Sequence, residues 1–240
     1  MAKVKFHFFG KDCFLDNSLR DTADVCQKIK YVGFDFNYHP HFINQIHGSQ
    51  VLVIDSVSKI FDEKNPLPKV DALVTNIKKL PICVITADCV PIVFFDEIAE
   101  VIGIAHSGWK GAKAGIIENT LEKMLKLGAK IEQIKVIIGP CIRQKFYEVS
   151  KEFFDDFIKM DEKNAAFFVA GNGENGARSG HFLFDLAAYC IFRLKNSGII
   201  NISDQGIDTY SNEETFFSYR RSTHRKEADC GRNVSVVMID

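Results

Sequence analysis

Apolar residues along the chain gather in short runs that predict β-strands, with polar or turn-forming segments between them. Runs of four to eight residues rich in Val, Ile and Phe are typical of strands. The densest group of runs falls between residues 82 and 105. The predicted strands cover 3–9, 51–55, 82–86, 92–95, 101–105, 134–139 and 233–239.

Other segments carry helical patterns. The apolar residues of 111–127 recur at i, i+4, i+5 and i+8, and Gly128 then supplies a residue that commonly ends helices. We also expect helices at 151–160 and 185–195, and the polar stretch 19–30 is capable of forming one. Strands and helices mix without strict alternation, which predicts a mixed α/β or α+β sheet domain. With no repeat and no long linker, residues 1–240 are interpreted as one domain.

A glycine-rich segment, 170–180, contains a match to the dinucleotide-binding pattern G-x-G-x-x-G at Gly171, Gly173 and Gly176. That motif requires a helix after its third glycine, so that the helix N-terminus faces the pyrophosphate. Here a β-like segment, 181–184, follows instead. We therefore expect an exposed hairpin or loop.

Composition and charge exclude several classes of protein. The 30 basic and 31 acidic residues leave a net charge of −1, so no domain-wide basic field indicates nucleic acid or an anionic membrane as a partner. No apolar run approaches the roughly 18 residues of a membrane-spanning helix, and we expect a cytoplasmic location. The seven cysteines are odd in number and widely spaced, which fits reduced thiols.

Three turns beside predicted strands carry a histidine or a cysteine, namely His47, Cys89 and His106. Imidazole nitrogen and thiolate together suit zinc and, less selectively, copper. Three protein ligands leave a fourth position for water or substrate, as in catalytic zinc sites. The spacings of 42 and 17 residues are not diagnostic, so the residues alone leave both a metal centre and ordinary buried side chains open.

Seven segments in chain order form a more specific pattern: QIHGSQV (45–51), VDALVT (70–75), TADCVPI (86–92), AHSGWKG (105–111), IGPCI (138–142), FDL (184–186) and FFSYRR (216–221). Together they resemble the signatures of the laccase-domain (YfiH-type) family, called polyphenol oxidase and now interpreted as purine nucleoside phosphorylase. The resemblance implies a single α+β domain with layered mixed sheets flanked by helices, an α/β/β/α sandwich. That fold is distantly similar to some bacterial-toxin cysteine hydrolases.

The resemblance also implies a zinc site, sometimes occupied by copper, made by His47, Cys89 and His106. It implies phosphorolysis of adenosine, inosine, guanosine and methylthioadenosine, together with deamination of adenosine at the same centre. The expected partners are purine nucleosides and phosphate. The sequence does not decide between a monomer and a homodimer.

Phosphorolysis requires cations around the phosphate, and arginine suits this task because its planar fork meets two phosphate oxygens. Our candidates are Arg220, Arg221, Lys110 and Arg143, with Asn44 as a further substrate-binding residue.

Deamination requires a carboxylate that moves protons. Asp88, adjacent to Cys89, is the nearest in sequence, and Asp71 is the competitor. The H-x-E and P-C-x-x-C signature of zinc cytidine deaminases is missing, so any deamination here uses a different arrangement.

The chain departs from the family pattern in several places. Asp208 stands where many members carry Cys, and the tail 222–232 is longer than usual. Ser107 and Lys110 replace a common Ala and Arg. We expect the two larger departures to alter the C-terminal wall of the pocket and its substrate preference.

Three alternatives remain from the sequence. A metal-free cysteine hydrolase would use Cys89 as nucleophile with His106 or His47 as base, for example on a cell-wall precursor. A copper-dependent polyphenol oxidoreductase is a second alternative, although a four-copper oxidase consumes more histidines than the seven present. The third is a binding protein that has lost catalysis.

Overall fold

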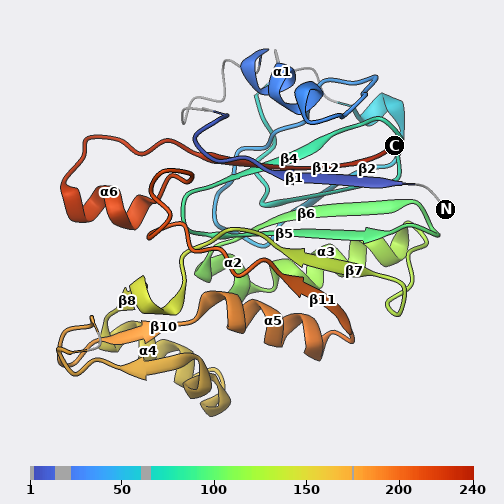
Figure 1. Cartoon of the computed structure of the whole chain (residues 1–240). Helices are drawn as coiled ribbons and strands as arrows, with labels where there is room; N and C mark the ends of the chain where they lie inside the picture. The colour runs from blue at the N-terminus through green and yellow to red at the C-terminus, as the bar shows by residue number, and fades with distance from the viewer. Residues whose placement is uncertain (1–2, 14–22, 61–65, 175) are drawn as a thin grey trace.

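The computed structural model describes residues 3–13, 23–60, 66–174 and 176–240 (Figure 1). Within these residues the strands form three sheets. The first is an antiparallel sheet with the order β1 (Val4–Phe8), β12 (Asn233–Ile239), β4 (Ile82–Thr86). The last strand of the chain is therefore the middle strand of its sheet.

The second sheet has six strands, and it carries most of the site. Its order is β11 (Asn201–Asp204), β7 (Lys135–Ile138), β5 (Val90–Asp96), β6 (Val101–Ser107), β3 (Ala72–Thr75), β2 (Val51–Ile54). The four central strands pair antiparallel, whereas the edge strands β2 and β11 pair parallel to their neighbours. Every residue of β5 and β6 is buried, because both faces of the sheet are covered.

The third sheet is small, with the order β8 (Glu148–Val149), β10 (Phe182–Phe184), β9 (Phe168–Ala170). Strands β9 and β10 are antiparallel neighbours, so the glycine-rich segment between them is a hairpin connection, as predicted. Its Gly173, Gly176 and Gly180 adopt positive φ angles, a conformation that glycine adopts without steric cost. Residue 175 lies outside the described residues.

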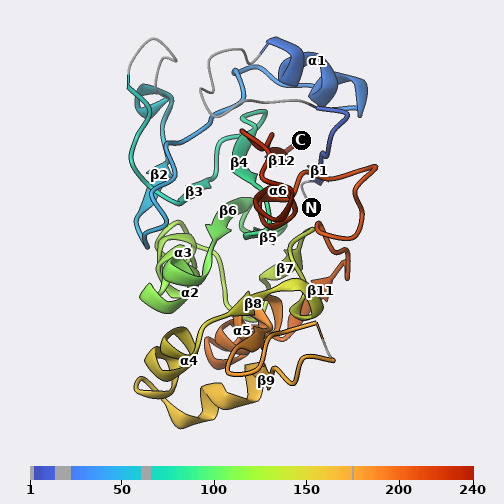
Figure 2. The same ribbon diagram turned by 90° about the vertical axis from the view of Figure 1, so that its left-hand side faces the viewer.

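Helices cover the sheets on both sides. They are α1 (Ala23–Tyr31), α2 (Trp109–Ala114), α3 (Ile116–Lys126), α4 (Lys151–Ile158), α5 (Leu186–Asn196) and α6 (Tyr219–Arg225), with short 3-10 helices η1 (Val57–Lys59), η2 (Gln144–Phe146) and η3 (Glu162–Phe167). Helix α1 lies over the three-stranded sheet that contains β12, while α2, α3 and α5 lie on the far side of the six-stranded sheet (Figures 1 and 2). Helix α4 packs with the small sheet below them.

Apolar residues fill the space between these layers. Leu73, Ile102 and Val237 belong to the cluster between the two larger sheets, whereas Phe94 and Met124 belong to the cluster under α3 and α5. The helix–sheet–sheet–helix order confirms the predicted α+β class with layered mixed sheets.

The helix predicted over 111–127 is in fact two helices. Helix α2 begins at Trp109, and Gly115, with φ of +94°, separates it from α3. Periodicity alone missed this break because the apolar stripe lies entirely within α3. Strands β3, β8, β9 and β11 and helix α6 were not predicted either, since each is short and α6 has no apolar stripe. Of the predicted segment 19–30, residues 19–22 lie outside the described residues.

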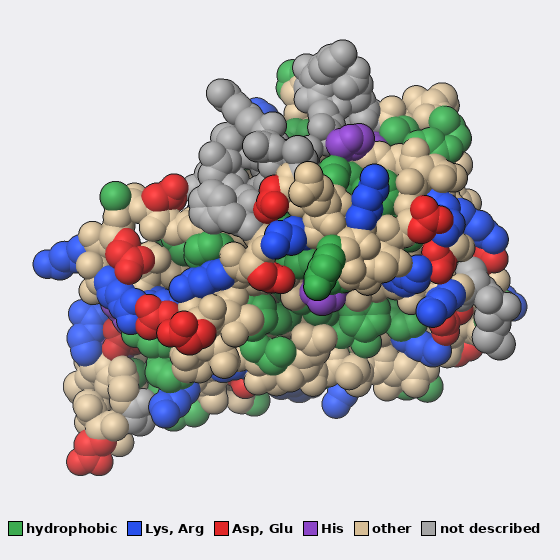
Figure 3. Space-filling view, turned by 45° about the horizontal axis from the view of Figure 1, so that its top comes forward, with side chains coloured by type: hydrophobic (Ala, Val, Ile, Leu, Met, Phe, Trp, Pro, Cys, Tyr) green, Lys and Arg blue, Asp and Glu red, His purple; other side chains and the backbone are tan. Residues whose placement is uncertain are grey.

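The surface shows no concentration of one charge on the face seen in Figure 3, where Lys and Arg are interspersed with Asp and Glu. No helix in the described part of the chain combines the length and apolar character needed to span a bilayer.

Candidate metal centre and active site

Three segments bring His47, Cys89 and His106 together, and we call these residues the triad. His47 lies in the turn before β2, Cys89 connects β4 to β5, and His106 is near the end of β6. The antiparallel register of β5 and β6 sets Pro91 opposite His106. Cys89 precedes Pro91 by two residues and therefore lies at the same end of the sheet as His106. One potential ligand atom from each triad residue lies within 4.8 Å of the other two.

Asp71 contacts two of the three triad residues. Its side chain is fully buried, and its Oδ1 lies 2.9 Å from His106 Nδ1. Its oxygens also accept backbone N–H bonds from His47 at 2.9 Å and Gly48 at 2.7 Å. Burial acts to raise the pKa of Asp71, but the bonds from His106 and Gly48 outweigh it and lower that pKa. Asp71 thus holds His106 through its imidazole and His47 through the backbone of its turn.

The ionisable groups of the triad strongly shift one another's pKa values. Burial acts to raise the pKa of the Cys89 thiol, yet His106 and His47 lower it to about 6. Burial acts to lower the pKa of His106, yet Cys89 and Asp71 raise it to about 9. The thiolate is the form that ligates metals and the form that attacks as a nucleophile.

Two glycines allow α2 to approach the triad closely. A Cβ atom on Gly108 would lie 3.0 Å from Cys89 Sγ and 3.2 Å from His47 Cδ2. A Cβ atom on Gly111 would lie 2.7 Å from the carbonyl oxygen of Gly48, in the turn that carries His47. The two glycines of the G-W-K-G sequence are therefore a steric requirement of the site.

Two residues at the site have left-handed backbone conformations, which residues other than glycine rarely adopt. The φ angle is +58° at His47 and +91° at Asp88. Such strain persists only where the surroundings enforce it, and it concentrates at functional sites. The hydrogen bonds to Asp71 impose it on the His47 turn.

A cavity of about 520 Å³, cavity A, opens beside the triad. Its wall includes His47 and Cys89 together with Asp88, Tyr147, His181 and Arg220. Residues from α2, the segment before β8, the β9–β10 hairpin and α6 complete it. Arg178, Glu148 and His224 line this cavity as well, and Arg178 forms an ion pair with Glu148.

Of the four predicted phosphate ligands, Arg220 lies in the wall of cavity A. Its Nη1 donates to the carbonyl oxygen of Glu148 at 2.8 Å, and its guanidinium carbon lies 5.4 Å from the centre of the Tyr147 ring. Its backbone N–H donates to Asp88 at 2.6 Å. These contacts fix both the main chain and the side chain of Arg220.

The other three predicted phosphate ligands are engaged elsewhere. Arg221 is buried and donates to the carbonyl oxygens of Thr209, Tyr210 and Phe216, so it stabilises the 209–216 loop. Arg143 forms a two-bond ion pair with Asp204, at 2.7 Å for each bond. Lys110 is exposed, with its ammonium 5.5 Å from the Trp109 ring.

Asp88 lines cavity A and is buried. It accepts hydrogen bonds from Thr209 Oγ1 at 2.7 Å and from the Arg220 backbone. Burial raises the pKa of Asp88 despite these bonds. The neighbouring Asp208, a departure from the family pattern, instead accepts the backbone N–H of Arg143 at 3.0 Å.

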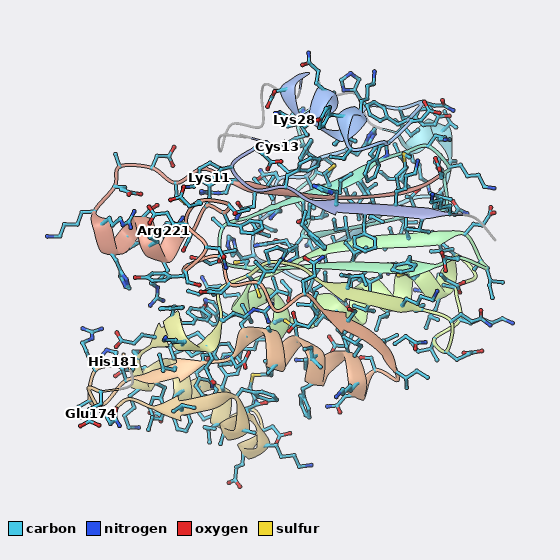
Figure 4. All side chains as sticks on the ribbon, in the orientation of Figure 1. Lys11, Cys13, Lys28, Glu174, His181 and Arg221 are labelled. Carbon is cyan, nitrogen blue, oxygen red and sulfur yellow. The ribbon has the colours of Figure 1, made fainter. Side chains whose placement is uncertain are left out.

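Sequence reasoning missed several residues of cavity A, among them Tyr147, Arg178, His181 and His224. They lie in the hairpin, to which the sequence analysis gave no binding role, in the unpredicted α6 or beside the unpredicted β8, so no motif marked them. Figure 4 shows His181 in the hairpin and Arg221 in α6, on the two sides of this end of the molecule. Within the described residues, His181 Nδ1 is buried without a hydrogen-bond partner.

A second cavity of about 470 Å³, cavity B, meets cavity A at the triad. Asn44, Thr86, His106 and Arg232 belong to its wall, so Asn44 lies where a substrate-binding residue is expected. Gln45 fixes this wall, because its amide bonds to the backbone of Ile85 in both directions, at 2.7 and 2.8 Å.

Comparison with known proteins gives consistent results. Residues 18–240 match a family model described as multi-copper polyphenol oxidoreductase laccase. A protein of Rickettsia conorii named purine nucleoside phosphorylase is 34% identical over 212 residues, which cover 88% of this chain and 83% of that protein. The purine nucleoside phosphorylase YfiH of Escherichia coli is 32% identical over 201 residues, which cover 84% and 76%.

Solved structures share the fold. A Neisseria meningitidis protein aligns with a TM-score of 0.78 and 27% identity, covering 100% of this chain and 96% of that one. A Bacillus licheniformis protein aligns with a TM-score of 0.80 and 23% identity, covering 100% and 90%.

Proposed function

The chain belongs to the family described as multi-copper polyphenol oxidoreductase laccase, and from this membership we propose that it is a zinc-dependent purine nucleoside phosphorylase. The reaction converts adenosine, inosine, guanosine or methylthioadenosine and phosphate into the free base and the sugar 1-phosphate. The observation that carries the proposal is the triad beside cavity A, whose wall contains Arg220.

The donor set of the triad fits zinc. One thiolate and two imidazoles with ligand atoms within 4.8 Å of one another match a three-ligand catalytic site. The Asp71 carboxylate on His106 Nδ1 matches the carboxylate–histidine–metal arrangement that orients zinc-binding histidines. Bound zinc supplies a Lewis-acid charge at the junction of the two cavities. Copper suits the same donors, so metal analysis belongs to the test.

In this proposal, phosphate binds in cavity A against Arg220. The anchored guanidinium presents a fixed fork to the phosphate oxygens, and His181 and His224 add hydrogen-bond donors. Tyr147 keeps the guanidinium plane in place. Because these groups are positioned before substrate arrives, little reorganisation is required as charge develops.

We also propose that adenosine deamination occurs at the same centre. Asp88 is the proposed proton carrier, because it is the carboxylate that adjoins Cys89 and lines cavity A. Cys89 and His106 serve both reactions as proposed zinc ligands.

Chromatography of nucleosides incubated with zinc-loaded protein, with and without phosphate, tests the proposal. We expect adenine from adenosine and hypoxanthine from inosine only when phosphate is present. Inosine formed from adenosine without phosphate supports the deaminase activity. Intact nucleosides in every sample overturn the proposal, and base release that ignores phosphate shows hydrolysis instead. Turnover that persists after zinc removal favours the cysteine-hydrolase alternative.

A further inference from the structure

Cavities A and B share only part of their walls. His47, Ala87, Cys89 and Tyr219 line both, so a ligand that extends from one cavity to the other passes over the triad. Cavity B adds polar groups of a different kind, a threonine hydroxyl, an asparagine amide and one arginine. Its volume of about 470 Å³ falls within the range typical of small-molecule sites.

Resting on the proposed function, we propose that cavity B binds the purine base of the nucleoside and prefers 6-oxopurines, with Arg232 and Thr86 as the specificity-determining residues. The ribose then lies over the triad, and the phosphate approaches from cavity A. A phosphate oxygen forms a bond to C1′ while the C1′–N9 bond breaks. The electron pair of that bond leaves on the purine, which then takes a proton from solvent.

Thr86 is the first observation behind this inference. Its side chain is only 2% exposed, and its Oγ1 has no hydrogen-bond partner among the described residues. Buried hydroxyl groups in folded proteins are nearly always bonded, and an exception calls for a specific explanation. A polar atom of a bound base supplies the missing partner.

Arg232 provides the second observation behind this inference. Its Nη1 donates to the carbonyl oxygens of Cys230 and Gly231. Gly231 itself packs so closely on Phe217 that a Cβ atom there would lie 2.6 Å from the ring. The arginine at the wall of cavity B is therefore held by its own main chain, with its guanidinium beside the cavity.

The guanidinium chemistry selects the base. Arginine donates two parallel bonds to the O6 and N7 acceptors of a 6-oxopurine, the pairing by which proteins read guanine. Adenine has an N6 amino group in place of O6, so this hydrogen-bond donor would face the N–H donors of the guanidinium. The same bonds stabilise the negative charge that develops on the departing 6-oxopurine. Asn44 does not discriminate, because its amide can present either a donor or an acceptor.

Tyr219 provides the third observation behind this inference. It begins α6, is 61% exposed and lines both cavities, which leaves its ring available at their junction. Purines stack favourably on aromatic faces. Cavity A is the better place for phosphate, because the anchored Arg220 guanidinium lines it together with His181 and His224, whereas the Arg232 guanidinium in the wall of cavity B faces the base.

Equilibrium binding of the free bases to the zinc-loaded protein tests the inference without turnover. We expect hypoxanthine to bind at least tenfold more tightly than adenine. Arg232→Ala should weaken hypoxanthine binding about 10- to 100-fold and leave adenine binding nearly unchanged, and Thr86→Val should weaken hypoxanthine binding about tenfold. The matched control is Arg225→Ala, because Arg225 is exposed and pairs with Glu213. Its base binding should equal that of the unmodified protein.

Kinetics provide an independent measurement. Arg232→Ala should lower kcat/KM for inosine at least tenfold more than for adenosine, and Arg232→Lys should not restore the preference, since an ammonium lacks the fork. Tyr219→Ala should raise the nucleoside KM and spare the phosphate KM, while Tyr219→Phe should behave as the unmodified protein.

Three results in Arg232→Ala overturn the inference. A rise in phosphate KM, rather than a change in base preference, in Arg232→Ala would identify cavity B as the phosphate site. Equal losses for inosine and adenosine would make Arg232 a structural residue. Because base binding needs neither phosphate nor turnover, it can succeed where phosphorolysis fails. Phosphorolysis with unchanged preference in Arg232→Ala would uphold the function and reject the inference.

Discussion

His106 Nδ1 lies 2.9 Å from Asp71 Oδ1, and the same carboxylate accepts the backbone N–H groups of the turn that carries His47. One buried side chain thus contacts the imidazole of His106 and the backbone of His47, two residues that are 59 positions apart in the chain (47 to 106). The Nδ1 contact leaves His106 Nε2 as the nitrogen that can ligate a metal. Carboxylates that contact metal-binding histidines in this way fix the tautomer and raise ligand basicity.

Asp71→Asn should weaken zinc binding by about 10- to 100-fold. The asparagine amide has one acceptor oxygen, whereas the Asp71 carboxylate has two. The amide NH2 group would therefore face either a backbone N–H group of the His47 turn or His106 Nδ1. Competition with a chromogenic chelator measures the affinity. Asp55→Asn is the control, because Asp55 is exposed and, among the residues that the structure describes, pairs with Lys59 and its own turn. Equal zinc affinity in both variants would contradict the role assigned to Asp71.

Gly108→Ala should reduce zinc occupancy while the protein remains folded. The new methyl group would lie 3.0 Å from Cys89 Sγ and 3.2 Å from His47, so the ligands must shift. Gly103→Ala is the matched control, because its methyl group would lie 3.2 Å from Met124 Sδ in the core under α3. The control should lower Tm and keep its zinc, as measured by metal analysis and thermal unfolding. Full zinc occupancy in Gly108→Ala would refute the argument.

Arg220→Ala should raise the phosphate KM at least tenfold and change the nucleoside KM much less, because its guanidinium lies in the wall of cavity A. Steady-state kinetics with each substrate varied separately measures this split. Arg143→Ala, which loses the pair with Asp204 and a hydrogen bond to the carbonyl oxygen of Ile207, should keep the phosphate KM. An unchanged phosphate KM in Arg220→Ala would remove it from the phosphate site.

The adjacent arginine provides a contrast. Arg221→Ala leaves three carbonyl oxygens without their donor and should cost about 3 kcal/mol of unfolding free energy, measured with denaturant. A phosphate defect at normal stability in this variant would reverse the assignment of the two arginines.

Zinc removal should expose Cys89 to alkylation. Of the seven cysteines, Cys26 and Cys89 are the partly exposed ones and the other five are buried. A bound zinc protects the thiolate, so iodoacetamide should modify Cys89 only after chelation, as followed by peptide mass spectrometry. Cys26 serves as the internal control, since its labelling should not depend on the chelator. Rapid labelling of Cys89 in the zinc-loaded protein would contradict its role as a ligand.

The Arg143–Asp204 pair should make stability fall in acid. Burial acts to raise the pKa of Asp204, but Arg143 outweighs it and lowers that pKa. The resulting stabilisation is present above the pKa of the unfolded chain, near 3.9, and disappears as pH falls through the lower folded value. Asp204→Asn should cost about 1 kcal/mol at pH 7, since solvent screens the pair, and almost nothing near pH 2. Denaturant unfolding at both pH values checks this, and a constant difference would contradict it.

The parts of the fold that depend on apolar pattern were predictable. Strand β12 coincides with the predicted run at 233–239, and β4 coincides with the run at 82–86. The triad residues were recognisable as candidates because each stands in a short motif beside a strand. Helix α6 was not predictable, because YRRSTHR has no apolar periodicity and is held by buried polar contacts instead.

The composition of the cavity walls depends on the direction in which each side chain points, and the order of residues in the sequence does not reveal that direction. Arg220 and Arg221 are neighbours in sequence, yet they point about 100° apart around the helix axis, one toward cavity A and one into the protein. Likewise, Asp71 is the competitor of Asp88 as proton carrier in the sequence, and only the structure shows that its oxygens contact the turn and His106.

The central place of β12 in its sheet has a consequence for how the protein acquires its metal. Strands β1 and β4 both bond to β12, so this sheet closes only when segments more than 220 residues apart in the sequence meet. Contacts of such long range form slowly and late in folding. Cys89 follows β4 directly, so its final position is set in that last step. A nascent chain therefore presents scattered thiols and imidazoles, and a competent metal receptor arises only with the finished fold.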